Sequence, residues 1–298
     1  MTVKDVFEKL NTWGFSPKLK GDGSKEVIGF SDPKDYLPDT LIWIGKTEDI
    51  NTEKISFDDI ALVLAKEETG AESVLPNVIT LRDPKNAFMN LVYERYARAE
   101  EEHIDATAQI SESAVIGKNC WIGRNVIIED GAVIGDGCEI RENTYIGKNC
   151  VLGRDCAVGQ NVIIGGETNG SAFYDLNGVM RNMPNIGRVV IGNAVLIGAG
   201  SLIARGTFTD TEIGDECMLN AGTSIGHNCK IGKRVFLLGR CTISGNTKIG
   251  DSCQLISAAV KNRITIGNDV KVGIGSVVIK DVPSNKTVFG NPARIMPG

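Results

Sequence analysis

The stretch Ile116–Ile140, IGKNCWIGRNVIIEDGAVIGDGCEI, places a branched aliphatic residue at every sixth position. The same step, started at Ile104, meets an aliphatic residue at every position up to Ile164. A period of six fits neither the 3.6-residue repeat of an α-helix nor the alternation of a long strand. It is typical of a parallel β-helix, in which each hexad supplies one short strand and one corner. The sequence therefore predicts a mainly β fold.

Two long insertions, at 165–190 and 204–212, interrupt this phase. The regular positions beyond the first insertion are Ile191, Ile197 and Ile203, then every sixth residue from Ile213 to Leu255, and after a second slip Ile266, Val272 and Val278. Three hexads make a coil of about 18 residues, and coils stack at the strand spacing of about 4.8 Å. We expect about eight coils within residues 101–298.

All eight cysteines share one phase of the repeat, two residues before a core aliphatic residue. They are Cys120, Cys138, Cys150, Cys156, Cys217, Cys229, Cys241 and Cys253. Serine, alanine or valine could fill the same small, half-buried position, where a free cysteine behaves as a small hydrophobic residue. We therefore expect free thiols and no disulfide, metal or catalytic role for this set.

Residues 1–100 lack the six-residue repeat. The segment VKDVFEKL carries Val3, Val6 and Leu10 on one helical face, and AFMNLVYERYARAEEE shows similar spacing. Strand-like runs, TLIWIG and IALVLA, lie between these segments. We expect a small α/β domain at 1–100, joined through the polar stretch ARAEEEH to the β-helix domain at 101–298.

The overall composition argues against several classes of partner. A net charge of −5 gives no indication of nucleic acid or an anionic membrane as partner. No window approaches the roughly 18 apolar residues of a membrane span, and the N-terminus shows no secretory signal. We therefore expect a cytoplasmic protein.

His227 is one of only two histidines and lies two residues past the core residue Ile225. Arg205 and Gly245 have the same offset in the coils before and after it. The three residues should therefore stack along one face, roughly 5 Å apart at the backbone. Their offset directs them away from the axis, which makes His227 a candidate for chemistry. The other histidine, His103, precedes the first core residue, and we expect it to be structural.

Both insertions immediately precede the His227 coil, and a regular solenoid has no need of them. Loops of this kind typically build a wall around a site. The first insertion carries Phe173, Tyr174 and Arg181, which are suited to stacking on a ring and pairing with phosphate. We treat them as candidate substrate-binding residues, together with Arg205 and Asn220.

Two sets of motifs carry a resemblance to the left-handed β-helix acyltransferases of the hexapeptide-repeat superfamily. The segments NMPNIGRVVIGNAVLIGAGSLIARGTFTDTEIG and IGHNCKIG resemble the UDP-3-O-acylglucosamine N-acyltransferases of lipid A biosynthesis. The segments PDTLIWIG and KNAFMNLVYERYA resemble the small uridine-binding domain of that family more weakly. The segment LNAGTSIGHNCKIG and the ending GSVVIKDVPSNKTVFGNPARIM are more similar to acetyl-CoA-dependent acetyltransferases of UDP-linked amino sugars.

The resemblance implies roles for individual residues. His227 is the general base, and the backbone N–H of Gly245 forms the oxyanion hole. Trp43 stacks on uracil, which makes 1–100 a nucleotide-binding domain. The superfamily forms homotrimers, with donor and acceptor bound between neighbouring prisms.

This chain also departs from the lipid A enzymes. Lys46 and Asp49 stand where that family's nucleotide domain has an asparagine and a tyrosine. Its second active-site histidine would fall near Asn262 or Arg263, and its helical extension for acyl carrier protein is not found before Gly298.

The donor is where the two resemblances disagree. Lys280 and Arg294 lie in the ending that, in the acetyltransferases, is beside the nucleotide end of coenzyme A. Because the chain has no net positive charge for docking a carrier protein, we expect acetyl-CoA as the co-substrate. The alternative is a hydroxyacyl carrier protein, as in lipid A synthesis.

We therefore predict N-acetylation of a nucleotide-linked amino sugar, without a metal. A metal-dependent hydratase on this fold would need about three histidines around one zinc, and the chain has two. A non-catalytic scaffold or sugar-binding module is the remaining alternative of another class.

Overall fold

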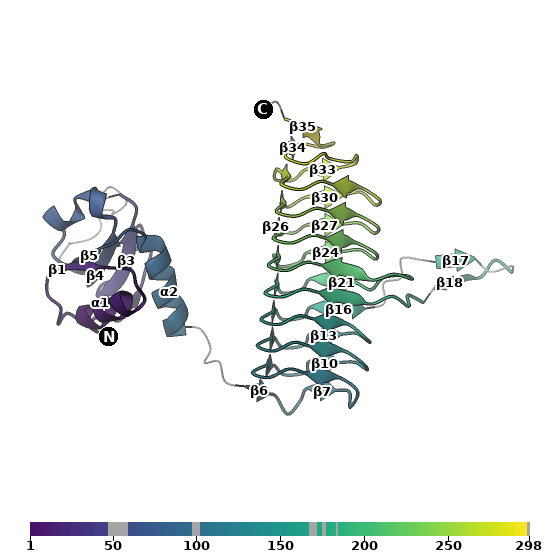
Figure 1. Ribbon diagram of the computed structural model, residues 1–298, viewed down its shortest axis with the longest axis horizontal. Helices are drawn as coiled ribbons and strands as arrows, with labels where there is room; N and C mark the ends of the chain where they lie inside the picture. The colour runs from purple at the N-terminus through teal and green to yellow at the C-terminus, as the bar shows by residue number, and fades with distance from the viewer. Residues whose placement is uncertain (47–58, 97–101, 167–171, 175–176, 183, 297–298) are drawn as a thin grey trace. The chain divides into compact units, whose positions relative to one another are not determined.

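The computed structural model describes residues 1–46, 59–96, 102–166, 172–174, 177–182 and 184–296. The chain divides into two compact units, Met1–Ala99 and Glu100–Gly298. Figure 1 shows both units, and each is described here by itself.

The second unit is a solenoid with three parallel sheets, which we call faces A, B and C in the order in which each coil visits them. Face A contains β6 (His103–Ile104), β9 (Trp121–Ile122), β12 (Glu139–Ile140), β15 (Ala157–Val158), β20 (Leu196–Ile197), β23 (Met218–Leu219), β26 (Phe236–Leu238), β29 (Gln254–Ile256), β32 (Lys271–Val272), β34 (Thr287–Phe289) and the antiparallel β35 (Arg294–Ile295).

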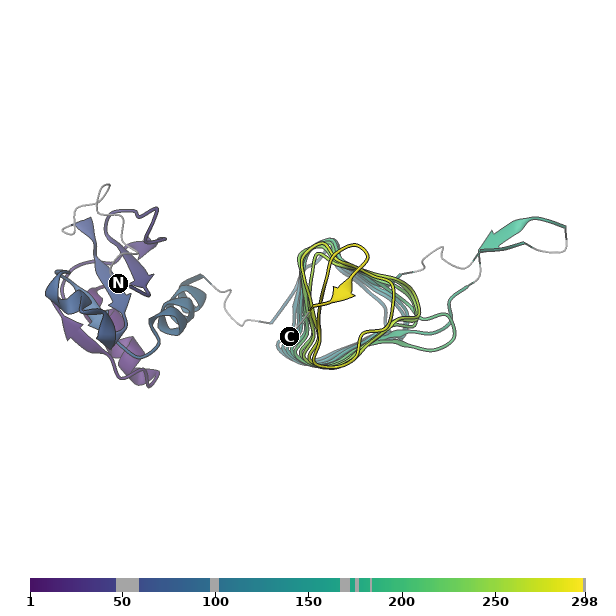
Figure 2. The same cartoon turned by 90° about the horizontal axis from the view of Figure 1, so that it is seen from above.

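Face B contains β7 (Gln109–Ile110), β10 (Ile127–Ile128), β13 (Tyr145–Ile146), β16 (Ile163–Gly166), β21 (Leu202–Ala204), β24 (Ser224–Ile225), β27 (Thr242–Ile243), β30 (Ala259–Val260) and β33 (Val277–Val278). Face C contains β8 (Val115–Ile116), β11 (Val133–Ile134), β14 (Val151–Leu152), β19 (Val189–Ile191), β22 (Thr211–Ile213), β25 (Lys230–Ile231), β28 (Lys248–Ile249) and β31 (Thr265–Ile266). Viewed along the axis, the coils superimpose as a triangle (Figure 2).

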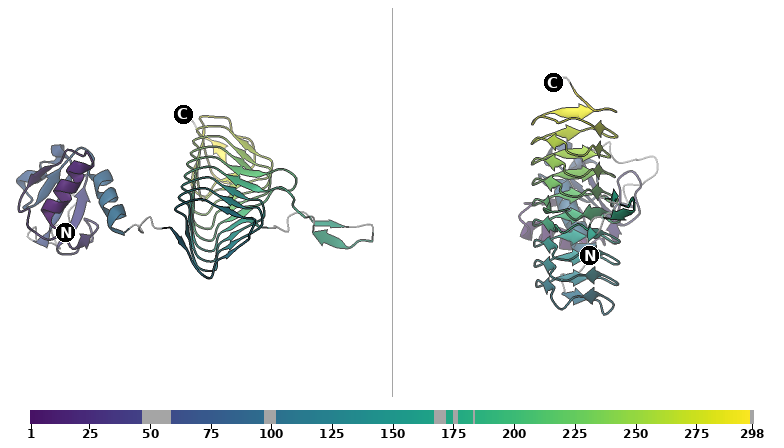
Figure 3. Two further views of the ribbon diagram at one scale, coloured as in Figure 1. Left: turned by 60° about the horizontal axis from the view of Figure 1, so that its bottom comes forward. Right: turned by 90° about the vertical axis from the view of Figure 1, so that its right-hand side faces the viewer.

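The expectation of about eight coils was too low. Ten of the eleven strands of face A run parallel and follow one another up the solenoid, as the stacked coils in Figure 3 show. Stepping by six missed Val260, which comes five residues after Leu255 and pairs with Ile243 and Val278. It also missed Val288, which pairs with Val272. Some upper coils are shorter than 18 residues, as between Ile243 and Val260 and between Val272 and Val288, so a fixed step passes over buried core positions.

The core contains the predicted aliphatic column from Ile122 upward, the cysteines, and valines and alanines of the same phase as the cysteines, whereas the predicted first core residue, Ile104, is exposed. All eight cysteines are free and buried. Several thiols donate to carbonyl groups of the next coil, such as Cys138 to Gly153 at 3.1 Å and Cys253 to Gly267 at 3.0 Å. Burial raises the pKa of Cys217 and Cys229 to about 11. These two thiols are therefore protonated at neutral pH.

Both long insertions leave the same corner, between faces B and C, which we call corner BC. The first runs from β16 to β19 and includes the antiparallel hairpin of β17 (Ala172–Tyr174) and β18 (Met180–Asn182), which forms a sheet of its own. The second runs from β21 to β22. In the coils that the structure describes, the corner between faces C and A, which we call corner CA, carries no insertion of this kind.

The first unit is built on a five-stranded sheet of order β1-β5-β4-β3-β2, and among these described strands only β1 is antiparallel to its neighbour. Its strands are β1 (Lys18–Lys20), β2 (Gly29–Phe30), β3 (Thr40–Ile44), β4 (Leu62–Ala65) and β5 (Val78–Thr80). Its helices are α1 (Val3–Thr12), α2 (Pro84–Tyr96) and the short 3₁₀ helices η3 (Glu67–Thr69) and η4 (Ala71–Ser73). A capping box between Thr2 and Asp5 begins α1, and its Val3, Val6 and Leu10 are buried. No helix among the described residues is long and apolar enough to cross a membrane.

Candidate active site

His227 follows β24 at corner BC. Strand pairing aligns Ile203 with Ile225 and Ile225 with Ile243, so Arg205, His227 and Gly245 occupy equivalent positions in three successive coils. The side chain of His227 is half-buried.

The imidazole ring of His227 lies directly against Gly245. A Cβ atom added to Gly245 would lie 2.6 Å from His227 Nε2 and 3.0 Å from Cε1. No real side chain tolerates such distances, so only glycine allows the ring to approach the backbone here. The ring edge that carries Nε2 therefore faces the Gly245 backbone.

Two backbone N–H groups beside this ring are free. Within the described part of the chain, the N–H groups of His227 and Gly245 donate to no other group. The peptide that follows Gly245 is fixed in place, because the Gly245 carbonyl accepts from Arg263 N–H at 3.1 Å. An unpaired N–H held beside an imidazole is the arrangement that stabilises a developing oxyanion.

The second insertion supplies the other side of the site. Thr207 Oγ1 lies 3.3 Å from His227 Nδ1, and Asn228 Oδ1 lies 2.9 Å from the same atom. Asn228 Oδ1 also accepts from the Thr207 backbone N–H at 2.9 Å. Thr207 and Asn228 were not among the site residues predicted from the sequence, although an asparagine directly after the candidate base was a signal for the second of them.

The two insertions are bonded to each other. Arg188, at the end of the first, donates from Nε to Asp210 Oδ2 at 2.9 Å, and the Ile186 N–H donates to the Thr207 carbonyl at 2.8 Å. Ile186 and Phe208 remain exposed on this wall. The predicted wall beside His227 therefore consists of 186–188 and the second insertion.

Arg205 holds this wall and does not reach into the site. Its Nε donates to the Gly187 carbonyl at 2.8 Å and its Nη2 to the Lys148 carbonyl at 3.4 Å. The repeat correctly predicted that the backbone of Arg205 lies one coil below His227. The direction of its long side chain is set by the carbonyl groups to which it donates.

The hairpin of the first insertion pairs Phe173 with Arg181 and Tyr174 with Met180 through the backbone. The side chains of Phe173, Tyr174 and Arg181 lie outside the described part of the structure. Their expected contacts with a ring and a phosphate therefore stay predictions.

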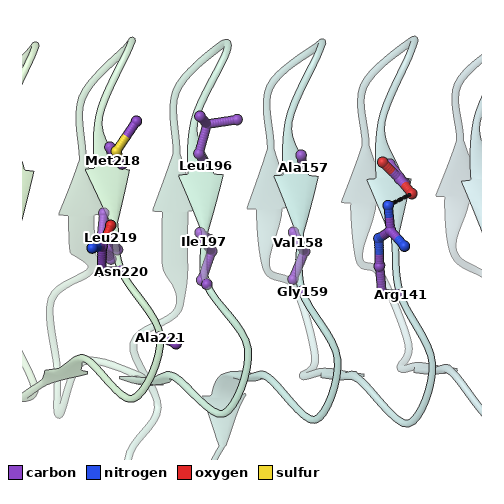
Figure 4. Close-up of a pocket in the computed structure, with 12 residues that line it drawn as sticks. Arg141, Ala157, Val158, Gly159, Leu196, Ile197, Met218, Leu219, Asn220 and Ala221 are labelled. Atoms are coloured by element: carbon purple, nitrogen blue, oxygen red, sulfur yellow. Dashed lines mark ion pairs between the residues drawn. The ribbon is translucent and has the colours of Figure 1, made fainter. Parts of the chain in front are cut away.

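Asn220 belongs to a different corner. It lines a shallow groove of about 350 Å³ on face A, together with Arg141, Leu196 and Met218 (Figure 4). Its carbonyl accepts from Thr223 Oγ1 at 2.7 Å. The structure thus does not bring Asn220 to His227.

Trp43 lies in β3 of the first unit. Its half-buried ring packs against the core of that unit, and Lys85 Nζ, from α2, lies 5.8 Å from the ring centroid. A base stacking on this ring would have to share it with Lys85.

The two cations of the ending differ in their relation to the site. Val278 aligns with Val260 and Val260 with Ile243, so Lys280 occupies the position equivalent to His227 three coils higher. That separation is about 15 Å at the strand spacing. Arg294 lies on β35 of face A and is exposed. Only Lys280 therefore shares corner BC with His227.

The charge of the solenoid is divided along its length. From His227 to Gly298 the chain has eleven lysines and arginines but three aspartates and glutamates, whereas residues 104–226 have eight and fourteen. The coils from His227 upward are therefore basic, which the net charge of the whole chain conceals.

Among the described residues, the remaining histidine and the acidic side chains form no metal site. His103 stacks on Trp121 at the lower end of face A, with ring centroids 5.6 Å apart. Within the described ranges no three histidine, cysteine or acidic side chains are placed to hold a metal ion.

Comparison with known proteins places these features in a class. Residues 113–148 match the bacterial transferase hexapeptide model (six repeats), residues 188–227 the hexapeptide repeat of succinyl-transferase, and residues 208–298 the GMPPB C-terminal domain. The chain resembles the hexapeptide-repeat acyltransferases, whose β-helix is of the left-handed type.

Within that class, the curated relatives that match this chain are N-acyltransferases. The UDP-3-O-acylglucosamine N-acyltransferase of Dechloromonas aromatica is 54% identical over 65 residues, which are 22% of this chain and 19% of the relative. The enzyme of the same name from Leptospira biflexa is 36% identical over 81 residues, 27% of this chain and 23% of the relative. The chain thus spans about a fifth of the length of these relatives.

Solved structures cover more of the solenoid. The UDP-N-acetylglucosamine acyltransferase of Francisella novicida is 26% identical with a TM-score of 0.59, covering 65% of this chain and 70% of that one. The enzyme of the same name from Campylobacter jejuni, at 22% identity and a TM-score of 0.59, covers 65% of this chain and 74% of that one. The latter shows the fold alone.

Proposed function

We propose that this protein is an N-acyltransferase that moves an acyl group from a thioester to the amine of a UDP-linked glucosamine. The observation that carries the proposal is the imidazole of His227 lying against Gly245, beside two N–H groups that have no partner in the described part of the chain. The names of the curated relatives, UDP-3-O-acylglucosamine N-acyltransferase, support the acceptor.

The reaction requires one base and one oxyanion donor. The neutral amine attacks the thioester carbonyl, His227 Nε2 accepts the amine proton, and the carbonyl oxygen becomes an oxyanion. A free backbone N–H at Gly245 is placed to stabilise this charge, an effect worth about 10²–10³ in turnover in other enzymes. Collapse of the intermediate forms the amide and expels the thiolate, which takes the proton from the imidazolium.

The donor we favour is a hydroxyacyl carrier protein. The curated relatives support the lipid A-type alternative over acetyl-CoA. The basic upper coils also remove our main argument against a carrier protein, because the positive charge that such a partner needs is present locally. Acetyl-CoA stays a second candidate, because Lys280 lies on the same corner as His227 and could pair with its phosphates.

A homotrimer is part of the proposal. Single apolar residues point outward from the strands on all three faces, including Val115 and Val133 on face C, Ile163 on face B and Leu196 and Phe236 on face A. Neighbouring prisms would bury these residues and create the clefts that the resemblance implies.

The test is a four-way assay with the full chain. UDP-3-O-acylglucosamine and UDP-linked glucosamine without the O-acyl group are each incubated with hydroxyacyl carrier protein and with acetyl-CoA, and products are identified by mass. We expect N-acylation of the O-acylated sugar from the carrier protein. Turnover only with acetyl-CoA would reverse the choice of donor, and no acylated product in any combination would overturn the function.

A further inference from the structure

We infer that the second insertion is a positioning device, in which Thr207 and Asn228 hold His227 in the tautomer that carries its proton on Nδ1. The catalytic consequence rests on the proposed function, but the tautomer itself is a property of the free protein. The insertion thus has a role beyond forming a wall.

The orientation of the Asn228 amide is fixed by two partners of opposite kind. Its oxygen accepts from the Thr207 backbone N–H, which can only donate, at 2.9 Å. Its nitrogen donates to Thr209 Oγ1 at 2.6 Å. A flipped amide would place an NH₂ group against the Thr207 N–H, so the oxygen must face His227.

The amide oxygen then fixes the proton on the imidazole. Asn228 Oδ1 lies 2.9 Å from His227 Nδ1, and an amide oxygen can only accept a hydrogen bond. Nδ1 must therefore carry the hydrogen, since the other tautomer would bring two lone pairs together at this distance. Thr207 Oγ1, at 3.3 Å, lies on the same side of the ring. The lone pair is thus left on Nε2, the atom that faces Gly245 and would accept the proton of the amine.

The insertion is what makes Asn228 rigid. Besides Thr207 and Thr209, it contributes Thr211, whose hydroxyl accepts from the Asn228 backbone N–H at 2.9 Å. Asn228 itself is in the left-handed conformation, with φ of 59°. Thr207, Thr209 and Thr211 of the insertion thus each form a hydrogen bond with Asn228.

The same corner contains a natural control. Asn246 is the equivalent residue one coil higher and has nearly the same φ, 61°. No insertion reaches it, and among the described residues its side chain makes no hydrogen bond. Asn246→Ala removes the same group from the same corner without touching the imidazole.

The experiment uses NMR of selectively ¹⁵N-labelled histidine in the full chain, at a pH where the imidazole is neutral. Because the chain has only two histidines, His103→Gln leaves the His227 signals alone. We expect the chemical shift of a protonated Nδ1 and an unprotonated Nε2. Asn228→Ala should produce a mixture of tautomers, Asn228→Asp should retain the Nδ1–H form, and Asn246→Ala should leave the spectrum unchanged.

The kinetic readout separates positioning from folding. Asn228→Ala should lower kcat about tenfold with little change in KM, and Asn228→Asp should restore most of it, since an acceptor oxygen is present again. A protonated Nε2 in the unaltered chain, or an Asn228→Ala spectrum identical to it, would overturn the inference. A chain that shows the Nδ1–H tautomer but acylates no sugar would instead overturn the proposed function and leave the inference standing.

Discussion

Corners CA and BC of the solenoid treat the same backbone group in opposite ways. At corner CA, in most coils, the N–H of the second residue past a core aliphatic donates to the side chain at the equivalent position in the next coil; the described N–H groups of Asp136 and Asp215 are the exceptions. Such bonds run from Lys118 to Asp136, Arg154 to Asn193, Asn193 to Asp215, Lys233 to Asp251, Asp251 to Asn268, and Asn268 to Ser284. At corner BC, in the described coils, none of the equivalent N–H groups donates to a side chain of the next coil.

This difference separates a structural corner from a functional one. A tight corner leaves a backbone N–H without a partner from the sheet, and that partner is then supplied by a side chain, by water or by a ligand. Corner CA uses a ladder of short polar side chains. Corner BC places Gly245, which has no side chain, above His227, so the His227 N–H has no side-chain acceptor in the next coil. Among the described residues, the Gly245 N–H also has no partner, which leaves both groups for a reacting molecule.

The substitution with the largest expected effect on turnover is His227→Ala. If corner BC is the reaction centre, turnover should fall by about 10²–10⁴, the usual contribution of a general base. The melting temperature should hardly change, because the half-buried ring lies outside the core. Single-turnover rates and thermal melts of the same preparation measure both effects. His103→Ala is the matched control, and a His227→Ala variant with full turnover would refute the assignment.

A pair of glycine substitutions tests the two corners directly. Gly245→Ala places a Cβ 2.6 Å from His227 Nε2 and must displace the ring, so kcat should fall about 10²-fold with little loss of stability. Gly232→Ala, at corner CA, places a Cβ 2.4 Å from Asp251 Oδ1 and disturbs a ladder bond. It should destabilise the fold by about 1–3 kcal/mol and leave kcat unchanged.

Urea unfolding and steady-state kinetics on both variants decide this prediction. If the two variants lost activity and stability in the same proportion, the corners would not differ in role.

A smaller effect is expected along corner BC above the site. Lys280→Ala should raise the KM for the donor about tenfold and leave kcat nearly unchanged, because a charge-assisted bond to a phosphate or carboxylate contributes about 1.5 kcal/mol. Added salt should reduce the difference between the variant and the unaltered chain. Lys271→Ala, on β32 of face A, is the control. Equal effects at both positions would show general attraction of an anionic donor and no preferred corner.

The sequence predicted the parts of this arrangement that depend on backbone periodicity. Equal offsets from Ile203, Ile225 and Ile243 were enough to align Arg205, His227 and Gly245, because a parallel sheet keeps its register over many coils. The single phase of the cysteines predicted that all eight occupy equivalent positions beside the core for the same reason, although the expected half-burial was too low and all eight are fully buried.

The remaining features of the site could not be predicted from the sequence, because they depend on side-chain direction and on irregular segments. Arg205 has a long side chain whose carbonyl partners lie at Lys148 and Gly187, far away in the sequence. Thr207 meets His227 only because an insertion folds back, which no period describes. Val260 was missed because one coil is a residue short.

The smallest expected effect concerns the cysteine nearest the site. Cys229 lies two residues after His227 but has the core phase, and its thiol donates to the Ser244 carbonyl at 3.3 Å. Its counterpart Cys217, at corner CA, donates to the Gly232 carbonyl at 3.1 Å. Because both corners share the same core and differ only in their outward residues, Cys229→Ser and Cys217→Ser should each cost about 1 kcal/mol of unfolding free energy, with kcat unchanged. Urea unfolding and turnover of the two variants check this, and loss of turnover in Cys229→Ser at unchanged stability would show that the thiol takes part in the chemistry.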